Sequence, residues 1–308
     1  MSHTIHCKHR HFVWDKSLPP VLTVAPGETA TFEVMDAWDG QLGPDSTIED
    51  MLKRDTARVN PVTGPVFIED AEPGDTLAVT MLSYRPSGWG WTANIPGFGL
   101  LTDEFPEAAL HIWRYQPEGN APILYGDVAK IPLAPFAGTA GIALREDGAH
   151  DIIPPRRTGG NMYVRDLTAG STLYLPVEVR GALFSVGDTH AAQGDGEVCG
   201  TAIESPMEVT LGFDLIKGYQ SPFPRITRTR APYPQAGGVD ITLGIGPDLH
   251  EVCRDAVRAM INELTAREKL SPVEAYMLCS VAGDLRISQI VDAPNWTVSF
   301  HMPRHIFD

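Results

Sequence analysis

Short apolar segments separated by tight turns dominate the first 240 residues of the chain. The segments lie at residues 21–24, 31–34, 66–69, 77–82, 173–179 and 209–215. Glycine and proline bound most of them, as in APGET at 25–29 and EPGDT at 72–76, each directly before a strand-like segment. Short strands with such turns are typical of a sandwich or a barrel. The pattern therefore predicts a mainly β fold, with a β-sandwich or barrel-like body over residues 1–220.

The pattern changes near residue 248, where apolar residues recur at helical spacing. The residues that repeat are Leu249, Val252, Ala256, Val257, Met260, Ile261 and Leu264. Their spacing predicts an amphipathic helix over 248–268. The sequence SPVE at 271–274 predicts a second helix, to about Val281, because serine and glutamate form a capping box and proline suits the first helical position. A strand is predicted over 284–291, so the C-terminal part is a small α+β unit.

The segment between these two parts begins with SPFPRITRTRAPYPQAGG at 221–238. Proline and arginine are frequent in it, which is typical of a segment that runs over the surface. We therefore predict three parts: a β-rich body at 1–220, a connector at 221–247, and an α+β unit at 248–308 that packs on the body.

Composition restricts the class of protein. The chain has 308 residues, of which 43% are hydrophobic and 20% charged, so it can bury a full core. A formal net charge of −15 argues against a nucleic-acid partner, which would need a basic surface. No apolar stretch is long enough to cross a membrane, and Cys7, Cys199, Cys253 and Cys279 form no closely spaced pair. We expect a cytoplasmic protein without a membrane or nucleic-acid partner.

The densest polar segment follows a predicted strand, ALFSV at 182–186, and reads VGDTHAAQGDGE at 186–197. Asp188 and His190 stand two residues apart, so in an extended chain their side chains point to the same face. Carboxylates and an imidazole that converge in this way suit a divalent metal ion. Asp-x-His is a common sequence, however, and a polar glycine-rich segment is more often only a turn.

Two further segments carry polar groups next to turns. MDAWDGQ at 35–41 follows a predicted strand, and TGGN at 158–161 has two glycines before Asn161. The glycine amides and the asparagine side chain could stabilise an oxyanion that develops during a reaction. A hairpin turn is the simpler interpretation of the same residues. A serine hydrolase is not indicated, because the chain has no Gly-x-Ser-x-Gly sequence.

Several of these segments resemble motifs of the acetamidase/formamidase family. The longest and most specific match is GALFSVGDTHAAQGDGE at 181–197. Shorter matches are PVTGPV at 61–66, AEPGD at 71–75, GWGW at 88–91, PGFG at 96–99, GGNM at 159–162 and SVAGDL at 280–285. The resemblance covers nearly the whole chain, from His11 to the last predicted strand. The chain length is similar to that of the shorter, acetamidase-like branch.

The resemblance implies an enzyme that hydrolyses a carbon–nitrogen bond other than a peptide bond, converting a small linear amide to a carboxylate and ammonia. It also implies a mainly β architecture with a small C-terminal α/β part, a divalent metal ion, and self-association into a dimer or larger homo-oligomer. The positions that match shared family motifs are Asp36, Gln41, Gly159, Gly160, Asn161, Asp188, His190, Gln193, Asp195, Glu197 and Glu204.

We assign these residues to the roles that amide hydrolysis requires. The expected metal ligands are Asp36, Asp188, His190 and Glu197, and the expected ion is zinc, with calcium or manganese as alternatives. The expected catalytic residues are Asn161, Gln193, Asp195 and Glu204. Asp195 or Glu204 would exchange protons, and Asn161 with the Gly160 backbone would orient the amide or hold the oxyanion. The expected substrate-binding residues are His11, Gln41, Trp89, Gly160 and Tyr163.

One position departs from the family pattern. Members usually continue Gly-Gly-Asn-x-Asp, and here Tyr163 stands at the last position. If that carboxylate binds a metal or the substrate in relatives, this chain has a changed metal content or a changed substrate; Tyr163 could also simply pack beside the turn. Two alternatives stay open: a hydrolase of a bulkier or cyclic amide or a urea-like compound, and a non-catalytic, metal-containing β-sandwich that only binds its ligand.

Overall fold

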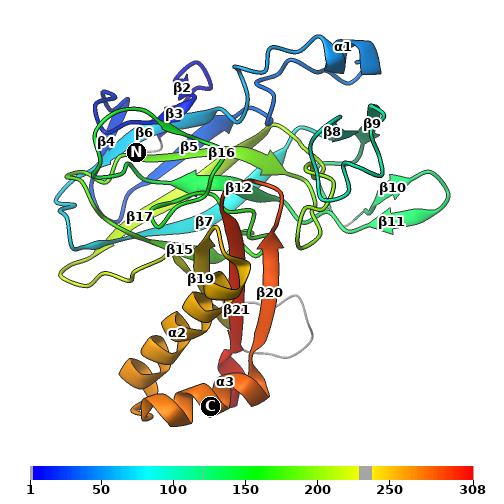
Figure 1. Cartoon of the computed structure of the whole chain (residues 1–308). Coiled ribbons are helices and arrows are strands. Elements are labelled where there is room, and N and C mark those ends of the chain that lie inside the picture. Colours follow the sequence, from blue (N-terminus) through cyan, green and yellow to red (C-terminus); the bar gives the residue numbers. More distant parts are fainter. Residues whose placement is uncertain (1–2, 120, 229–237, 308) are drawn as a thin grey trace.

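Two large β-sheets form the body of the molecule in the computed structural model, which describes residues 3–119, 121–228 and 238–307 (Figure 1). The first sheet has nine strands, in the order β1 (His3–Ile5), β5 (Thr29–Val34), β17 (Met207–Ile216), β7 (Thr76–Pro86), β15 (Ser171–Pro176), β18 (Arg225–Arg228), β19 (Val239–Gly246), β21 (Trp296–Pro303) and β20 (Asp284–Gln289). The second has six: β14 (Gly159–Asn161), β12 (Phe136–Gly141), β16 (Phe184–His190), β6 (Val62–Ile68) and β2 (Arg10–His11) in this order, with β4 (Leu22–Val24) also paired to β6. The predicted mainly β fold is confirmed, and no sheet closes into a barrel within these ranges.

The other elements of the described ranges are short strand pairs and helices. The strand pairs are β3 (Val13–Trp14) with β13 (His150–Asp151), β8 (Trp89–Asn94) with β9 (Ala109–Arg114), and β10 (Ile123–Tyr125) with β11 (Ala129–Ile131). The helices are α1 (Ile48–Leu52), α2 (Leu249–Glu268), α3 (Pro272–Ala282) and the 3-10 helix η1 (Arg304–Phe307). Among them, none combines the length and the apolar character that a membrane-spanning helix needs.

The two large sheets enclose a core of aromatic and aliphatic side chains. Alternate residues of β5 and β17 are buried, because only one face of each strand meets the core. Phe32 and Phe213 come from these two strands of the nine-stranded sheet, and Phe184 comes from β16 of the six-stranded sheet. The ring of Phe184 lies edge-on to both, with centroids 6.1 Å and 5.5 Å away. The body is therefore a sandwich, and its strand β16 is buried along its whole length.

The C-terminal unit extends the nine-stranded sheet and adds helices to it (Figure 1). Helix α2 packs on β19 and β21, and α3 packs on α2. Both helices form where the sequence predicts them, because Asp248 caps α2 and the capping box of Ser271 and Glu274 begins α3. The strand predicted over 284–291 is present as β20.

The described part of the segment predicted as a connector, 221–247, contains regular structure. It contains β18 and β19, which pair antiparallel inside the nine-stranded sheet. Strand β18 buries only Ile226 and Thr227, between half-buried Arg225 and Arg228 that pair with Glu263 and Asp166, so the segment looks polar as a sequence. Residues 229–237 of the predicted connector lie outside the described residues, and the division of the chain into domains stays a prediction.

Helix α2 packs closely on β19 at Gly244, and a substitution there can test this contact. A Cβ atom at this position would overlap the carbonyl oxygen of Val252, so α2 would have to shift. We expect Gly244→Ala to lower the free energy of unfolding by about 1–3 kcal/mol. Gly246→Ala is the matched control, because its Cβ would stand 3.4 Å from its nearest neighbour. Chemical denaturation measures both variants, and equal midpoints would contradict the close contact.

Candidate active site

A buried polar cluster forms beside the six-stranded sheet, where several segments of the chain meet. Strand β16 supplies Asp188 and His190, and β14 ends at Asn161. Glu204 lies on a segment that bridges to the backbone of His190 and to that of Trp91 in β8. Asp292 comes from the loop between β20 and β21, so the C-terminal unit contributes to the cluster. The cluster residues are at most 2% exposed.

The imidazole of His190 is the centre of this cluster. Its Nε2 atom lies 3.0 Å from Glu204 Oε2 and 3.1 Å from Asp188 Oδ1. Glu197 Oε1 is the next oxygen, 4.0 Å from the same nitrogen. One ligand atom each from Asp188, His190 and Glu204 can be chosen so that all lie within 4.8 Å of one another, which is the spacing that a single metal ion needs.

Gln193 fixes a proton on the Nδ1 atom of His190. The Gln193 Nε2 atom donates to the carbonyl oxygen of Tyr163 at 3.2 Å, so its Oε1 atom is left to face His190 Nδ1 at 2.9 Å. An amide oxygen only accepts, and Nδ1–H must therefore donate. This arrangement leaves Nε2 for the side of the ring that faces the carboxylates, as in histidines that bind metals through one nitrogen and donate through the other.

Hydrogen-bond donors from two loops contact the second carboxylate oxygen of Asp188. Tyr163 donates its hydroxyl to Asp188 Oδ2 at 2.7 Å, and Asn60 Nδ2 approaches the same oxygen at 3.3 Å. Asn161 is fixed as well, because it accepts from the hydroxyl of Thr139 and donates to Asp292 Oδ2 at 3.0 Å. The polar side chains therefore form one connected network rather than separate pairs.

Burial of so many carboxylates shifts their protonation. Burial raises the pKa of Glu204 to about 7 and raises the pKa values of Glu197 and Asp292 well above their ordinary range. Burial acts in the opposite direction on His190, but the charges of Glu204 and Asp188 outweigh it and raise the His190 pKa well above its ordinary value. The pKa of Asp188 is lowered, since His190 more than offsets the effect of burial.

The cluster fits a divalent cation on two observations. Four buried carboxylates, of Asp188, Glu197, Glu204 and Asp292, surround one imidazole, so negative charge exceeds positive charge unless protons or a cation enter. In addition, Glu197 Oε1 and Glu204 Oε2 are buried without a donor in hydrogen-bond geometry among the residues that the structure describes. Oxygen and imidazole ligands of this kind suit zinc, manganese or calcium.

Asp36 and Gln41, which sequence analysis placed in the site, interact mainly with their own loop. Asp36 is fully buried, and burial raises its pKa to about 6. Its carboxylate accepts from the backbone N–H groups of Trp38 and Gly40 and from the indole of Trp91, whose backbone pairs with Glu204. Asp36 is therefore linked to Glu204 through Trp91 but is not one of the residues whose ligand atoms converge. The side chain of Gln41 bonds to the backbone of residues 55 and 58.

The other predicted residues lie at varying distances from His190. Asp195 is exposed and forms an ion pair with Arg165, with 3.1 Å between Nε and Oδ1. His11 bonds to Ser185 on β16, and burial lowers its pKa. Gly160 lies buried next to Asn161 in β14, and half-buried Trp89 starts β8. Of the predicted set, the structure brings together Asn161, Tyr163, Asp188, His190, Gln193, Glu197 and Glu204.

Sequence analysis missed three members of the network. Asn60 directly precedes the PVTGPV segment and has a left-handed backbone with φ 47°, so its place beside a family motif was an available signal. Thr139 lies in β12, opposite Asn161. Asp292 follows β20 and reaches Asn161 across 131 positions of sequence, and no pattern in the sequence indicates that contact.

A cavity of about 580 Å³ adjoins the cluster at Gln193. Ala192, Ala202 and Ile203 form part of its wall, and Arg165 and Arg228 lie on another part. Because Gln193 contacts His190 through Nδ1, this cavity lies on the side of the imidazole away from the carboxylates.

Comparison with known proteins identifies the family of this chain. A model of the Acetamidase/Formamidase family matches residues 2–147 and 141–308. An acetamidase of Mycolicibacterium smegmatis is 32% identical in a 270-position alignment; the match covers 68% of this chain and 66%, just under two thirds, of that protein. A formamidase of Methylophilus methylotrophus is 29% identical, with 97% of this chain and 89% of that protein covered.

Solved structures extend the similarity to the whole fold. The structure of an acetamidase from Bacillus halodurans has a TM-score of 0.88 and 31% identity, covering 99% of this chain and 98% of that one. A gamma lactamase from Delftia acidovorans is more distant, with a TM-score of 0.65 and 26% identity over 97% of this chain and 90% of that one. Because the family model spans nearly every residue and the resemblance seen in the motifs is confirmed, this chain belongs to the acetamidase/formamidase family.

Proposed function

We propose that this protein hydrolyses a small linear amide to a carboxylate and ammonia at the cluster around His190. One observation carries the proposal: Asp188, His190 and Glu204 hold metal-ligand atoms within 4.8 Å of one another at a buried site, in a chain of this family. Relatives named acetamidase and formamidase support a linear amide as the substrate. The near-complete burial of the cluster suits a substrate of few atoms.

The ligands that we propose for the ion are Asp188, His190 and Glu204, with zinc as the first choice and manganese or calcium as alternatives. Such a cation, when bound, polarises a carbonyl group and lowers the pKa of water in contact with it. Glu204 replaces Asp36 in this assignment, because three hydrogen bonds from its own loop and from Trp91 occupy the Asp36 carboxylate.

The residues around the ligands would carry the remaining steps. Glu197 Oε1 is buried, lies 4.0 Å from His190 Nε2 and accepts no hydrogen bond from the described part of the chain. We assign to Glu197 the transfer of a proton from water to the departing ammonia. Asp195 is less suited, since it is exposed and paired with Arg165. The Asn161 side-chain amide donates one hydrogen to Asp292 and keeps a second one for the oxygen of the substrate amide.

A cyclic amide is the second candidate substrate. The observation that favours it is the similarity to a gamma lactamase structure over nearly the full length of both chains. A lactam contains the same bond between a carbonyl carbon and a nitrogen, and its hydrolysis opens a ring instead of releasing ammonia. The same cluster would serve, and only the space around it would decide between the two substrates.

A substrate panel tests the proposed reaction. We expect ammonia release from at least one of formamide, acetamide and propionamide. Dialysis against a chelator should abolish the release, and zinc or manganese should restore it. A γ-lactam in the same panel, followed by the appearance of the ring-opened amino acid, tests the second candidate. If the metal-loaded protein hydrolyses none of these amides, the remaining interpretation is a binding protein without activity. In that case, removal of the metal by a chelator would lower only the melting temperature.

A second prediction concerns Glu204. Glu204→Gln keeps the shape of the side chain but removes a charge from the ligand set, so we expect kcat/KM to fall at least about 100-fold together with the bound metal content. Glu208→Gln is the matched control, because Glu208 is a half-exposed carboxylate on β17 that pairs with Arg85. Activity assays and elemental analysis of both variants give the answer, and full metal content in Glu204→Gln would rule out its role as a ligand.

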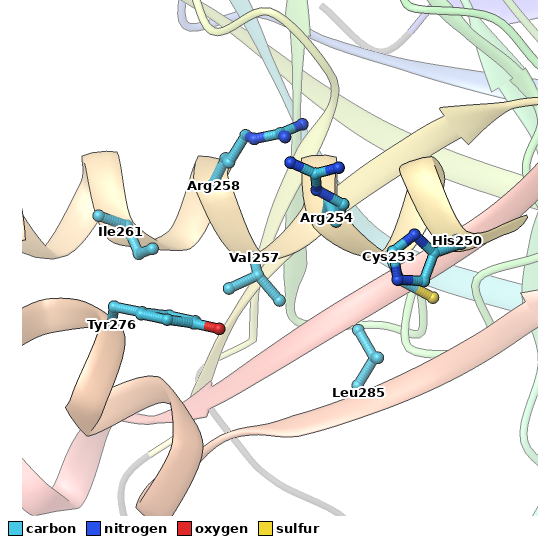
Figure 2. Close-up of a pocket in the computed structure, with 8 residues that line it drawn as sticks. All are labelled: His250, Cys253, Arg254, Val257, Arg258, Ile261, Tyr276 and Leu285. Carbon is cyan, nitrogen blue, oxygen red and sulfur yellow. The ribbon is translucent and has the colours of Figure 1, made fainter. Parts of the chain in front are cut away.

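We further propose that the protein self-associates through the outer face of α3 and the groove beside it. Helix α3 exposes Val273, Tyr276, Met277 and Val281 to solvent although its other face is packed in the core of the C-terminal unit. A groove of about 350 Å³ lies next to it, between α2, α3 and β20, with Val257, Tyr276 and Leu285 turned toward it (Figure 2). An apolar ridge beside an apolar groove is self-complementary, so a two-fold axis can seat each ridge in the groove of a second copy.

Light scattering tests this association. We expect the double variant Met277→Glu, Val281→Glu to have the mass of a single chain at concentrations where the wild type has at least twice that mass. Val128→Glu is the control, because Val128 is 87% exposed and lies between β10 and β11, away from this face. A wild type that remains a single chain at all concentrations would contradict the proposal.

The proposed location is the cytoplasm. All four cysteines are free thiols, which supports a reducing compartment. The high negative charge gives no reason to expect a nucleic-acid partner.

A further inference from the structure

Tyr163 contacts the proposed metal-binding pair, Asp188 and His190, in three separate ways. Its hydroxyl donates to Asp188 Oδ2 at 2.7 Å. Its ring stacks on the imidazole of His190, with 5.3 Å between centroids and 16° between planes. Its carbonyl oxygen accepts from Gln193, whose own oxygen faces His190 Nδ1. One residue thus touches or orients both ligands that β16 supplies.

The backbone around Tyr163 is built to hold the ring in this place. Tyr163 has a left-handed backbone with φ 51°, and it is 5% exposed. A Cβ atom at Gly138 of β12 would stand 2.7 Å from two ring atoms of Tyr163, so the ring occupies the space that a side chain would need there. The ring of Phe136 also contacts His190, edge-on at 5.1 Å between centroids. The imidazole therefore packs against two aromatic rings.

The hydroxyl contact has a consequence for the way in which Asp188 can bind an ion. Tyr163 and Asn60 both approach Oδ2, whereas Oδ1 faces His190 Nε2 at 3.1 Å. A carboxylate whose one oxygen is engaged by donors has only the other oxygen free for a cation. Zinc is satisfied by one oxygen from each carboxylate, whereas calcium takes more oxygens and accepts both from one carboxylate.

We propose that Tyr163 is a positioning residue whose hydroxyl limits Asp188 to one metal-binding oxygen and thereby makes the site prefer zinc over calcium. The inference rests on the proposed function, because it takes Asp188, His190 and Glu204 as the ligands of a divalent ion. It adds a determinant of ion choice that lies outside the ligand set.

The test is Tyr163→Phe, which keeps the ring and removes the hydroxyl. Apo protein is prepared by dialysis against a chelator, and the affinities for zinc and for calcium are measured separately by competition with a chelating indicator. We expect zinc affinity to fall about 10-fold, in the range seen when a hydrogen-bond partner of a ligand is lost. Calcium affinity should stay the same or rise, so the ratio of the two affinities falls.

The matched control is Tyr84→Phe, which removes the hydroxyl of a half-buried tyrosine that donates to the Leu167 carbonyl at 2.6 Å. A general effect of losing a tyrosine hydroxyl would lower stability in both variants without changing the ratio of affinities. Asn60→Ala removes the other donor to Oδ2 and should shift the ratio in the same direction by a smaller factor. Circular dichroism of the apo variants checks that each is folded.

The outcomes separate this inference from the proposed function. If the wild type binds zinc and releases ammonia but Tyr163→Phe keeps the wild-type ratio of affinities, the role of Tyr163 is overturned and the proposed function stands. The role is also overturned if Tyr163→Phe weakens zinc and calcium by the same factor. If the wild type binds neither ion at this cluster, the metal part of the proposed function fails first, and Tyr163 then has no ion to select.

Discussion

Negative charge concentrated around a single imidazole is the constraint on which the rest of this structure depends. Four carboxylates are buried within the network that includes His190, and burying a charge is costly unless an opposite charge or hydrogen bonds compensate it. Every other member of the network can be understood as part of that compensation. Gln193 directs a proton to Nδ1, Tyr163 and Asn60 donate to Asp188, and Asn161 donates to Asp292.

The β-sandwich makes such a cluster possible because it is rigid where the charges lie. Strand β16 is buried along its length, and β12 pairs with it as far as His190, whereas its pairing with β6 ends at Gly187. The backbone of His190 is held on its other side by a bridge to Glu204. The C-terminal unit takes part in the same structure. Its strands continue the nine-stranded sheet, and the loop after β20 brings Asp292 to Asn161. The helices of that unit are therefore linked, through β20 and β21, to the geometry of the site.

Sequence reasoning identified the regular parts and the local motif but not the long-range contacts. Alternation in β5 and β17, the capping box at Ser271 and the pair Asp188 and His190 are all local, and each has a direct physical cause within a few residues. Strand β18 was taken for a connector, because two arginines flank its only two buried residues. Asp36 has the acidic side chain that a metal needs, but its own loop uses both oxygens, which only the folded chain shows. Asp292 joins the cluster only because the fold brings the loop after β20 next to Asn161.

Because Gly138 and Tyr163 are in close contact, the residues allowed at position 138 depend on the residue at position 163. As long as an aromatic ring fills the space above β12, position 138 cannot acquire any side chain, because even a methyl group would press against that ring. A smaller residue at 163 would remove the clash with the ring and leave the Asp188 carbonyl oxygen, 3.0 Å away, as the next neighbour. A side chain at 138 is therefore easier to accommodate after a change at 163 than before it, although position 138 takes no part in the chemistry.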